Sequence, residues 1–440
     1  MVRTLEGFVQ NTLSITLDIC HAEQMRRLCA TTAPLLCALL AVVAAVWLGA
    51  QASDSAKVRL HAGPATEAFD MPIHVAVDGL YKGEKVTVQG LSRDASGGQW
   101  KSWARFTAGS GTLDLARSVP EAGTYHVADA AGLLWSLQPP APLGSSPGRL
   151  GAGDRFIVQM QVLVGGRVVA EQALTRSVPQ PTQNPTVATA GFHGSLYLPP
   201  NLAASPNTPA IVVIGGSEGG VPRPVAAGFE AAGYPSLALG YFGEPDLPSC
   251  LCSIPLEYFA HAVAWLRSQP GFADRPVVLW GASRGGEGAL VLASYQPDLF
   301  DEVIAVAPSD QVNGPFGPGA DQASAAWTLN GQPLPAAPDP IPVSRIRVPV
   351  LLTAGGADIV WSSAVYAANV MARLDSTPGA PAHHYLAFPD AGHAMAGITP
   401  YVPYNTAVYG GTPEANAFAA ESTWPQMIAF INRAERHSVP

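Results

Sequence analysis

One five-residue motif in the second half of the chain constrains the fold more than any other feature. Gly281-Ala282-Ser283-Arg284-Gly285 has the pattern G-x-S-x-G, and it follows a short apolar run at residues 276–280. A sharp turn from a strand into a helix presents a serine hydroxyl at the end of a sheet. Such a turn crowds the backbone, so glycines flank the serine, and Gly286 and Gly288 let the helix approach its neighbours. The motif therefore predicts that Ser283 is a nucleophile, in preference to a chance glycine-rich turn.

Apolar runs and helical patterns alternate on both sides of this motif. Two stretches have helical spacing, residues 225–232 and residues 256–268. Six short runs are typical of buried parallel strands: residues 210–214, 236–239, 276–280, 303–306, 350–353 and 384–388. Strands that alternate with helices form a mostly parallel sheet that is covered by helices on both faces. We therefore expect residues 187–437 to form an α/β-hydrolase catalytic domain.

A serine hydroxyl is a poor nucleophile at neutral pH and needs a base. In this fold the catalytic groups come in the order serine, acid, histidine. Asp358 follows the run at 350–353, and His393 follows the run at 384–388. Functional groups of parallel sheets gather at the carboxyl ends of the strands. We expect His393 to accept the Ser283 proton and Asp358 to orient and stabilise the imidazole.

Other residues compete for the roles of base and acid. His383 and His384 are rival bases, but they lie before or within the last apolar run rather than after it. The rival acids are Asp339, Asp375 and Asp390. Asp390 is the strongest of these because it is close to His393 in the chain, but that position places it in the loop that carries the base.

Acyl transfer also requires hydrogen-bond donors for the oxyanion. The residue after the nucleophile supplies one, so the backbone N–H of Arg284 is expected to donate. A second donor is expected from the glycine-rich loop at residues 215–220, at Ser217 or close to it. Such a loop can instead cradle a phosphate, but no Lys-Ser or Lys-Thr pair completes a phosphate-binding motif here. No motif calls for a metal ion or a cofactor, and none is predicted.

The residues that precede this region have the pattern of an all-β domain. Polar and apolar residues alternate at residues 73–77, 85–88 and 156–164, and Gly165-Gly166 marks a hairpin turn. Short strands at this spacing predict a β-sandwich of about seven strands over residues 57–178. Residues 179–186 are rich in proline and polar side chains, which is typical of a linker.

The first 56 residues have the pattern of a leader. Met25 precedes Arg26-Arg27, an apolar stretch and the small-residue sequence Ala50-Gln51-Ala52. A basic start, an apolar middle and an A-x-A end predict a secretory signal peptide. Cleavage near Ala52 would export the chain to the periplasm or the medium. The alternative is a membrane anchor through residues 31–50, which carry no charge.

Composition limits the partners. Hydrophobic residues make up 48% of the chain and charged residues 13%, as in a globular protein. The 24 basic residues against 33 acidic ones give a formal net charge of −9, and no basic run follows a regular element. Nucleic acid is therefore excluded as a partner. The expected partner is a small-molecule acyl thioester or ester.

Only two cysteines follow the leader, Cys250 and Cys252. A spacing of two residues is awkward for a disulfide, because the Cα atoms of a bridge usually lie about 4.4–6.8 Å apart with the Cβ atoms facing. We therefore expect two free thiols in a loop, with a strained disulfide as the alternative.

Motifs along nearly all of the mature chain resemble the acyl-CoA thioesterase and bile acid-CoA:amino acid N-acyltransferase family. The matching segments in the first domain are residues 71–75, 79–80, 92–94 and 132–136, and those in the second are residues 215–220, 241–242, 247–248, 256–259, 281–285, 349–352, 358, 361–363 and 391–393. The resemblance implies an immunoglobulin-like first domain. It also implies a triad of Ser283, Asp358 and His393 that hydrolyses long acyl thioesters.

The chain departs from this family in two respects. The acyltransferase branch is similar but carries cysteine as nucleophile, so Ser283 favours hydrolysis over amide formation. The best-known members are intracellular, whereas this chain is expected to be exported, where acyl-CoA is scarce. An exported carboxylesterase or related acyl hydrolase is therefore the main alternative to a thioesterase. An N-acyltransferase and a non-catalytic binding protein remain as further alternatives.

Overall fold

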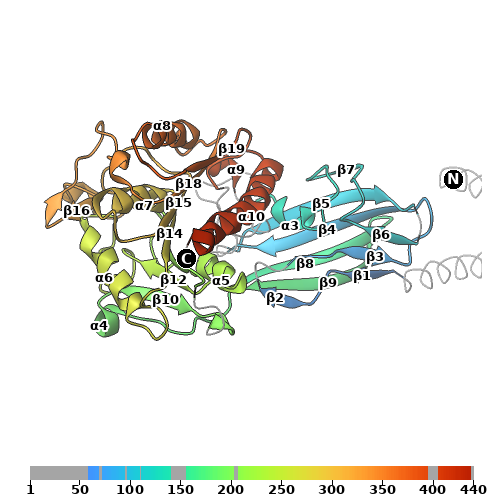
Figure 1. The fold of residues 1–440 in the computed structure, drawn as a ribbon. Coiled ribbons are helices and arrows are strands. Elements are labelled where there is room, and N and C mark those ends of the chain that lie inside the picture. The colour runs from blue at the N-terminus through green and yellow to red at the C-terminus, as the bar shows by residue number, and fades with distance from the viewer. Residues whose placement is uncertain are drawn as a thin grey trace, which may run out of the picture.

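The computed structural model describes residues 58–68, 72–94, 97–109, 111–139, 155–202, 207–394 and 405–437. The expected cleavage site near Ala52 and the apolar residues 31–50 lie outside this range. Figure 1 shows two parts, one built of strands and one in which a sheet is surrounded by helices. Within the described range no helix is both long enough and apolar enough to cross a membrane.

The described residues before the linker form two sheets. The three-stranded sheet has the order β1-β3-β6, and the six-stranded sheet has the order β2-β9-β8-β4-β5-β7. A short helix, α3 (Gly132–Trp135), precedes β8. The strands are β1 (Arg59–His61), β2 (Thr66–Ala68), β3 (Ala76–Asp78), β4 (Lys85–Arg93), β5 (Gln99–Thr107), β6 (Thr112–Asp114), β7 (Ala122–Gly123), β8 (Arg155–Val164) and β9 (Arg167–Ser177).

These two sheets share a hydrophobic core. Val77 and Leu113 of the small sheet belong to the same buried cluster as Val88, Trp100 and Val162 of the large one. Exposed and buried residues alternate along β5, as expected for a strand with one face on a core. The described part contains nine strands where the sequence predicts about seven, because several are pieces of only two or three residues.

The second part is organised by a seven-stranded sheet with the order β10-β12-β11-β14-β15-β18-β19. Every neighbouring pair is parallel except β10 and β12. The strands are β10 (His193–Tyr197), β11 (Ala210–Ile214), β12 (Ser236–Gly240), β14 (Val277–Ala282), β15 (Glu302–Val306), β18 (Val350–Gly355) and β19 (His384–Phe388). The six predicted runs each become a strand of this sheet.

Helices and a small second sheet surround these strands. The second sheet has the order β13-β16-β17. Its strands are β13 (Ile254–Pro255), β16 (Trp327–Leu329) and β17 (Gln332–Pro333). The helices are α4 (Val187–Ala190), α5 (Arg223–Ala231), α6 (Leu256–Arg267), α7 (Arg284–Tyr295), η3 (Ala320–Gln322), η4 (Val343–Arg345), α8 (Ser363–Asp375), α9 (Thr406–Tyr409) and α10 (Pro413–His437).

Alternate side chains of the seven-stranded sheet enter two different cores. Ile211 and Val213 of β11 pack in the cluster that contains Phe229 of α5 and Phe430 of α10. Val212 and Ile214 pack in the cluster of α6, α7 and α8. The sheet is therefore covered on both faces, which is the layered arrangement of an α/β fold. Figure 1 shows α10 beside α3, where the two parts of the molecule meet.

Candidate active site

Ser283 lies between β14 and α7, in the middle of the seven-stranded sheet. Its backbone has φ 57° and ψ −122°, a conformation that costs a residue other than glycine about 1–3 kcal/mol. Such strain persists only where the surrounding structure holds it in place. The Ser283 N–H donates to the carbonyl oxygen of Val306, at the end of the neighbouring strand β15. The sharp strand-to-helix turn predicted from the motif is therefore present.

The glycines of the motif are required by close backbone approach. A Cβ on Gly281 would collide with the carbonyl group of Gly285, and a Cβ on Gly285 would collide with the carbonyl oxygen of Gly215. A Cβ on Gly288 would lie 2.9 Å from the ring of Trp327. The prediction that glycines let α7 approach its neighbours is confirmed.

The structure brings Ser283, His393 and Asp358 into one hydrogen-bonded chain. His393 Nε2 lies 2.8 Å from Ser283 Oγ, and His393 Nδ1 lies 2.8 Å from Asp358 Oδ2. The side chains of His393 and Asp358 are 7% and 1% exposed. The base and the acid reach the serine from loops that follow β19 and β18, as the strand order led us to expect. Both distances are those of hydrogen bonds, and the one between His393 Nε2 and Ser283 Oγ is short enough for direct proton transfer.

The acid and the imidazole are held on several sides. Asp358 Oδ1 accepts the backbone N–H groups of Val360 and Trp361, which leaves Oδ2 for the histidine. The Trp361 ring meets the His393 ring edge-on at 5.5 Å, and its Nε1–H donates to Ala307 at the end of β15. Tyr409 stacks on the imidazole with ring centroids 6.3 Å apart and planes 8° from parallel. The imidazole is thus fixed in orientation by two aromatic rings and a carboxylate.

Asn416 of α10 positions the loop that carries the base, and sequence reasoning missed it. Its Oδ1 accepts the N–H of Gly392 at 2.7 Å, and its Nδ2 donates to Gly410 at 3.2 Å. The backbone N–H of His393 donates to Tyr409 at 2.7 Å. Asn416 follows Gly392 by 24 positions and belongs to no local motif. Only the packing of α10 against the sheet brings it to the site.

The rival acids and bases lie elsewhere. His383 is buried and its Nδ1 accepts the N–H of Val350, at the start of β18, away from the carboxyl edge. His384 meets the ring of Phe430. Asp339, Asp375 and Asp390 are exposed. Within the described part of the chain, no group of three or more His, Cys, Asp or Glu residues could hold a metal ion.

The glycine-rich loop lies directly against the nucleophile. A Cβ on Gly216 would lie 3.0 Å from Ser283 Cβ. Arg284 is the first residue of α7, so its N–H has no acceptor within the helix. Ser217 follows Gly216 and is partly exposed. The predicted sources of both donors therefore adjoin Ser283, while the donor role of Ser217 stays a prediction.

Cys250 and Cys252 form a disulfide, so the expectation of two free thiols is wrong. Their Cα atoms are 5.2 Å apart, which lies within the usual range for a bridge. Leu251, between them, is fully buried, and its backbone pairs with Phe316. The loop is thus folded back tightly enough to allow the bond, which spacing alone does not reveal.

Comparisons with known proteins cover both parts of the chain. The family model "Acyl-CoA thioester hydrolase/BAAT N-terminal region" matches residues 70–185, and "BAAT / Acyl-CoA thioester hydrolase C terminal" matches residues 328–436. A "Putative esterase" model matches residues 261–378. The chain is 28% identical to acyl-coenzyme A thioesterase 3 of Mus musculus, over 82% of this chain and 91% of that protein. It is 29% identical to acyl-coenzyme A thioesterase 1 of Homo sapiens, over 83% of this chain and 94% of that protein.

Two of the solved structures that the chain resembles are a dienelactone hydrolase and a monoacylglycerol lipase. A dienelactone hydrolase from Anabaena variabilis is 20% identical and covers 55% of this chain and 94% of its own, with a TM-score of 0.33. The monoacylglycerol lipase of Paleococcus ferrophilus is 14% identical and covers 55% of this chain and 99% of its own, with a TM-score of 0.35.

The parallel sheet and the strand–turn–helix at Ser283 define an α/β-hydrolase, and the protein is an enzyme of that class. The chain belongs to the acyl-CoA thioesterase and bile acid-CoA:amino acid N-acyltransferase family.

Proposed function

We propose that the protein is a serine-dependent acyl thioester hydrolase that works through an acyl-enzyme on Ser283. One observation carries this proposal: the continuous chain of hydrogen bonds from Asp358 through His393 to Ser283. The relatives named acyl-coenzyme A thioesterases support an acyl thioester as the substrate.

The geometry accounts for acylation of the serine. Ser283 Oγ attacks the thioester carbonyl carbon while His393 Nε2 takes the hydroxyl proton. The negative charge passes to the carbonyl oxygen, which we expect to accept hydrogen bonds from the Arg284 N–H and from the glycine-rich loop, at Ser217 or close to it. The tetrahedral intermediate then expels the thiolate, which takes the proton from His393. The acyl group is left as an ester on Ser283.

Deacylation repeats these steps with water. His393 removes a proton from a water molecule, and the hydroxide attacks the Ser283 ester. The second tetrahedral intermediate expels Ser283 Oγ, which recovers the proton from His393, and a carboxylic acid is released. Asp358 accepts a hydrogen bond from His393 Nδ1–H in both halves of the reaction, so the positive charge of the imidazolium has a buried partner.

The charges around the site support a second candidate, an acyl ester hydrolase whose leaving group is uncharged. A cavity of about 1450 Å³ borders Asp358, and its described lining residues come from both sheet regions but include neither Ser283 nor His393. Among its described lining residues there are five carboxylates and no Lys or Arg. They are Asp129, Asp358, Asp390, Glu414 and Glu421. Residues 187–437 also contain no lysine. Coenzyme A carries several phosphate charges, and a carrier that reached the triad past Asp358 would meet this acidic lining.

A hydrolysis panel distinguishes these two candidates. Acyl-CoAs are assayed beside oxygen esters and uncharged thioesters of the same acyl chain length, and kcat/KM is measured for each pair. Higher kcat/KM for the acyl-CoA than for both uncharged substrates supports a thioester hydrolase that recognises coenzyme A as the carrier. Higher kcat/KM for the oxygen ester than for both thioesters supports the ester hydrolase, and higher kcat/KM for the uncharged thioester supports a thioester hydrolase with another carrier. Hydrolysis of none of them would contradict both candidates.

We also propose that the chain is exported and that residues 57–178 form an immunoglobulin-like module. The leader pattern and the Cys250–Cys252 disulfide support export, since disulfides persist mainly in oxidising compartments. Two sheets that pack around a common core support the sandwich.

A further inference from the structure

A buried ion pair lies beside the nucleophile, on the first turn of α7. Arg284 Nη1 is 2.9 Å from Glu287 Oε2, and the two side chains are 6% and 0% exposed. Burial lowers the pKa of Arg284 and raises the pKa of Glu287, because each charge has been removed from water. The catalytic steps described above use neither side chain.

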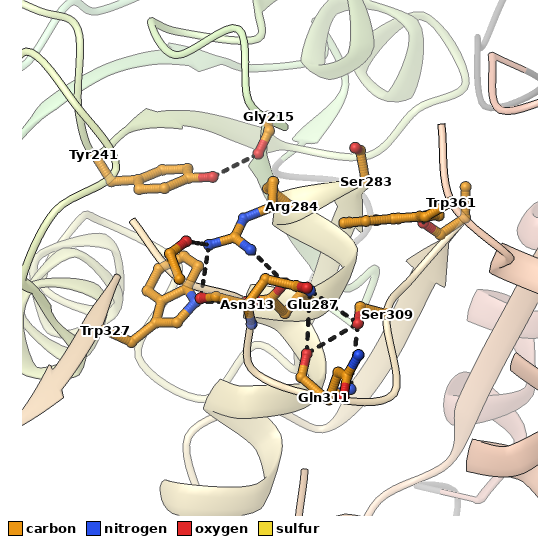
Figure 2. Close-up of polar contacts among 12 residues, drawn as sticks. Gly215, Tyr241, Ser283, Arg284, Glu287, Ser309, Gln311, Asn313, Trp327 and Trp361 are labelled. Carbon is orange, nitrogen blue, oxygen red and sulfur yellow. Dashed lines mark hydrogen bonds and ion pairs between the residues drawn. The ribbon is translucent and has the colours of Figure 1, made fainter. Parts of the chain in front are cut away.

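The Glu287 carboxylate accepts hydrogen bonds from two other segments of the chain. Its Oε1 accepts the backbone N–H of Asn313 at 3.2 Å and the indole Nε1–H of Trp327 at 2.9 Å. Its Oε2 also accepts from Asn313 Nδ2 at 2.7 Å. Figure 2 shows Arg284, Asn313 and Trp327 converging on this carboxylate. Glu287 therefore joins α7 to the loop after β15 and to β16.

The Arg284 guanidinium makes a parallel connection to the same loop. Its Nη2 donates to the carbonyl oxygens of Asn313 at 3.1 Å and Gly314 at 2.8 Å. The loop is braced further because Asn313 Nδ2 also donates to Ser309 Oγ at 2.9 Å. The residue whose backbone N–H adjoins Ser283 is thus held by its own side chain.

Tyr241 extends the network to the glycine-rich loop. Its ring stacks on Trp327 at 5.6 Å with an interplanar angle of 27°. Burial raises the pKa of Tyr241, so the hydroxyl keeps its proton, and it donates to the carbonyl oxygen of Gly215 at 2.7 Å. Gly215 precedes Gly216, which lies against Ser283. One connected set of contacts thus reaches both sources of oxyanion donors.

We propose that the Arg284–Glu287 pair is a positioning device that fixes the Arg284 N–H and the glycine-rich loop in the geometry required to stabilise the oxyanion. This inference rests on the proposed acyl-enzyme mechanism. Oxyanion donors act only if they are held in place before the charge develops. A buried ion pair is weak evidence for stability, since well-packed apolar residues often serve as well. Stability alone therefore does not explain why the pair adjoins the nucleophile.

The test compares Glu287→Gln, the double variant Arg284→Met/Glu287→Gln and a matched control. The control is Asp94→Asn, because Asp94 is also a buried carboxylate that accepts an indole N–H, from Trp100 at 3.0 Å, but it lies in the six-stranded sheet region. We measure kcat, KM, Tm and the Ki of an acyl trifluoromethyl ketone, which forms a tetrahedral adduct with a serine and mimics the oxyanion.

We expect Glu287→Gln to lower kcat about 10-fold or more with little change in KM. This loss should be smaller than the loss of about 100-fold to 1000-fold that follows the removal of an oxyanion donor itself. The Ki should weaken in the same proportion. The double variant should recover Tm, because no unpaired charge remains, but not kcat. Asp94→Asn should lower Tm and leave kcat and Ki unchanged. Recovery of kcat in the double variant, or equal effects of Glu287→Gln and Asp94→Asn, would show that the pair is merely structural.

A second substitution keeps the test decisive if Glu287→Gln does not fold. Arg284→Lys retains the charge, but a compact ammonium lacks the planar fork that reaches Asn313 and Gly314 together with Glu287. We expect a folded protein with reduced kcat and weaker Ki, and wild-type values would overturn the inference. If the wild-type protein neither hydrolyses any substrate nor binds the ketone, the proposed function fails as well. If the wild-type protein is active and the variants have wild-type kcat and Ki, the positioning inference is wrong and the proposed function stands.

Discussion

His393 is held through both of its ring nitrogens, and this fixes which one can act as the base. Nδ1 faces Asp358 and Nε2 faces Ser283, each at 2.8 Å. A carboxylate accepts only from a protonated nitrogen, so Nδ1 carries the proton and Nε2 is free to accept from the serine. The backbone N–H groups of Val360 and Trp361 hold the second oxygen of Asp358. The contacts of His393 therefore favour the tautomer that is protonated at Nδ1.

Asp358→Asn should therefore lower kcat by about 10⁴, because an amide in place of the carboxylate favours the wrong tautomer of His393. Asp390→Asn should change kcat only slightly, since Asp390 is exposed and the carboxylate that contacts His393 is that of Asp358. Both variants should be assayed with one thioester at saturating concentration. A large loss for Asp390→Asn and a small one for Asp358→Asn would show that the acid has been assigned wrongly.

At the scale of elements, the sequence predicts six strands of the sheet, including the edge strand β19, and misses the other edge strand, β10. The runs that become β11, β14 and β18 are continuous and apolar because these strands are buried on both faces. The edge strand β10 is not predicted, because His193, Gly194 and Ser195 interrupt any apolar run. It pairs only with β12, and in antiparallel register.

The residues of the candidate site also fall into those that the sequence predicts and those that it does not. Ser283, Asp358 and His393 each follow a predicted strand, so the strand order is enough to place them at one edge. Asn416 and the partners of Glu287 act from other elements, and their contacts depend on how α10 and the loop after β15 pack. The one local signal for the ion pair is the three-residue spacing of Arg284 and Glu287, which places both on one face of a helix.

At the scale of the whole molecule, the two sheet regions are not independent. The buried cluster that contains Val88 and Trp100 of the first region continues to Met427 of α10 and Ile211 of β11. The helix that supplies Asn416 to the base loop therefore also packs against the first region. The cavity beside Asp358 has lining residues from both regions.

The fate of the leader determines the compartment in which the protein acts. If the leader is a signal peptide, the mature chain should begin near Ser53, after the A-x-A sequence. N-terminal sequencing of protein recovered from the cell envelope and the medium measures this directly. An intact leader on envelope-bound protein would indicate a membrane anchor through residues 31–50 instead.

The central claim is that turnover passes through a covalent bond to Ser283, and the turnover of purified Ser283→Ala tests it most directly. The substitution removes one hydroxyl and its hydrogen bond to His393 but leaves the backbone contacts of the turn in place, so circular dichroism and Tm should be close to those of the wild type. Without the hydroxyl no acyl-enzyme can form, and the rate should fall by about 10⁴–10⁶. A folded Ser283→Ala protein that retains more than a few per cent of the wild-type kcat would contradict the account.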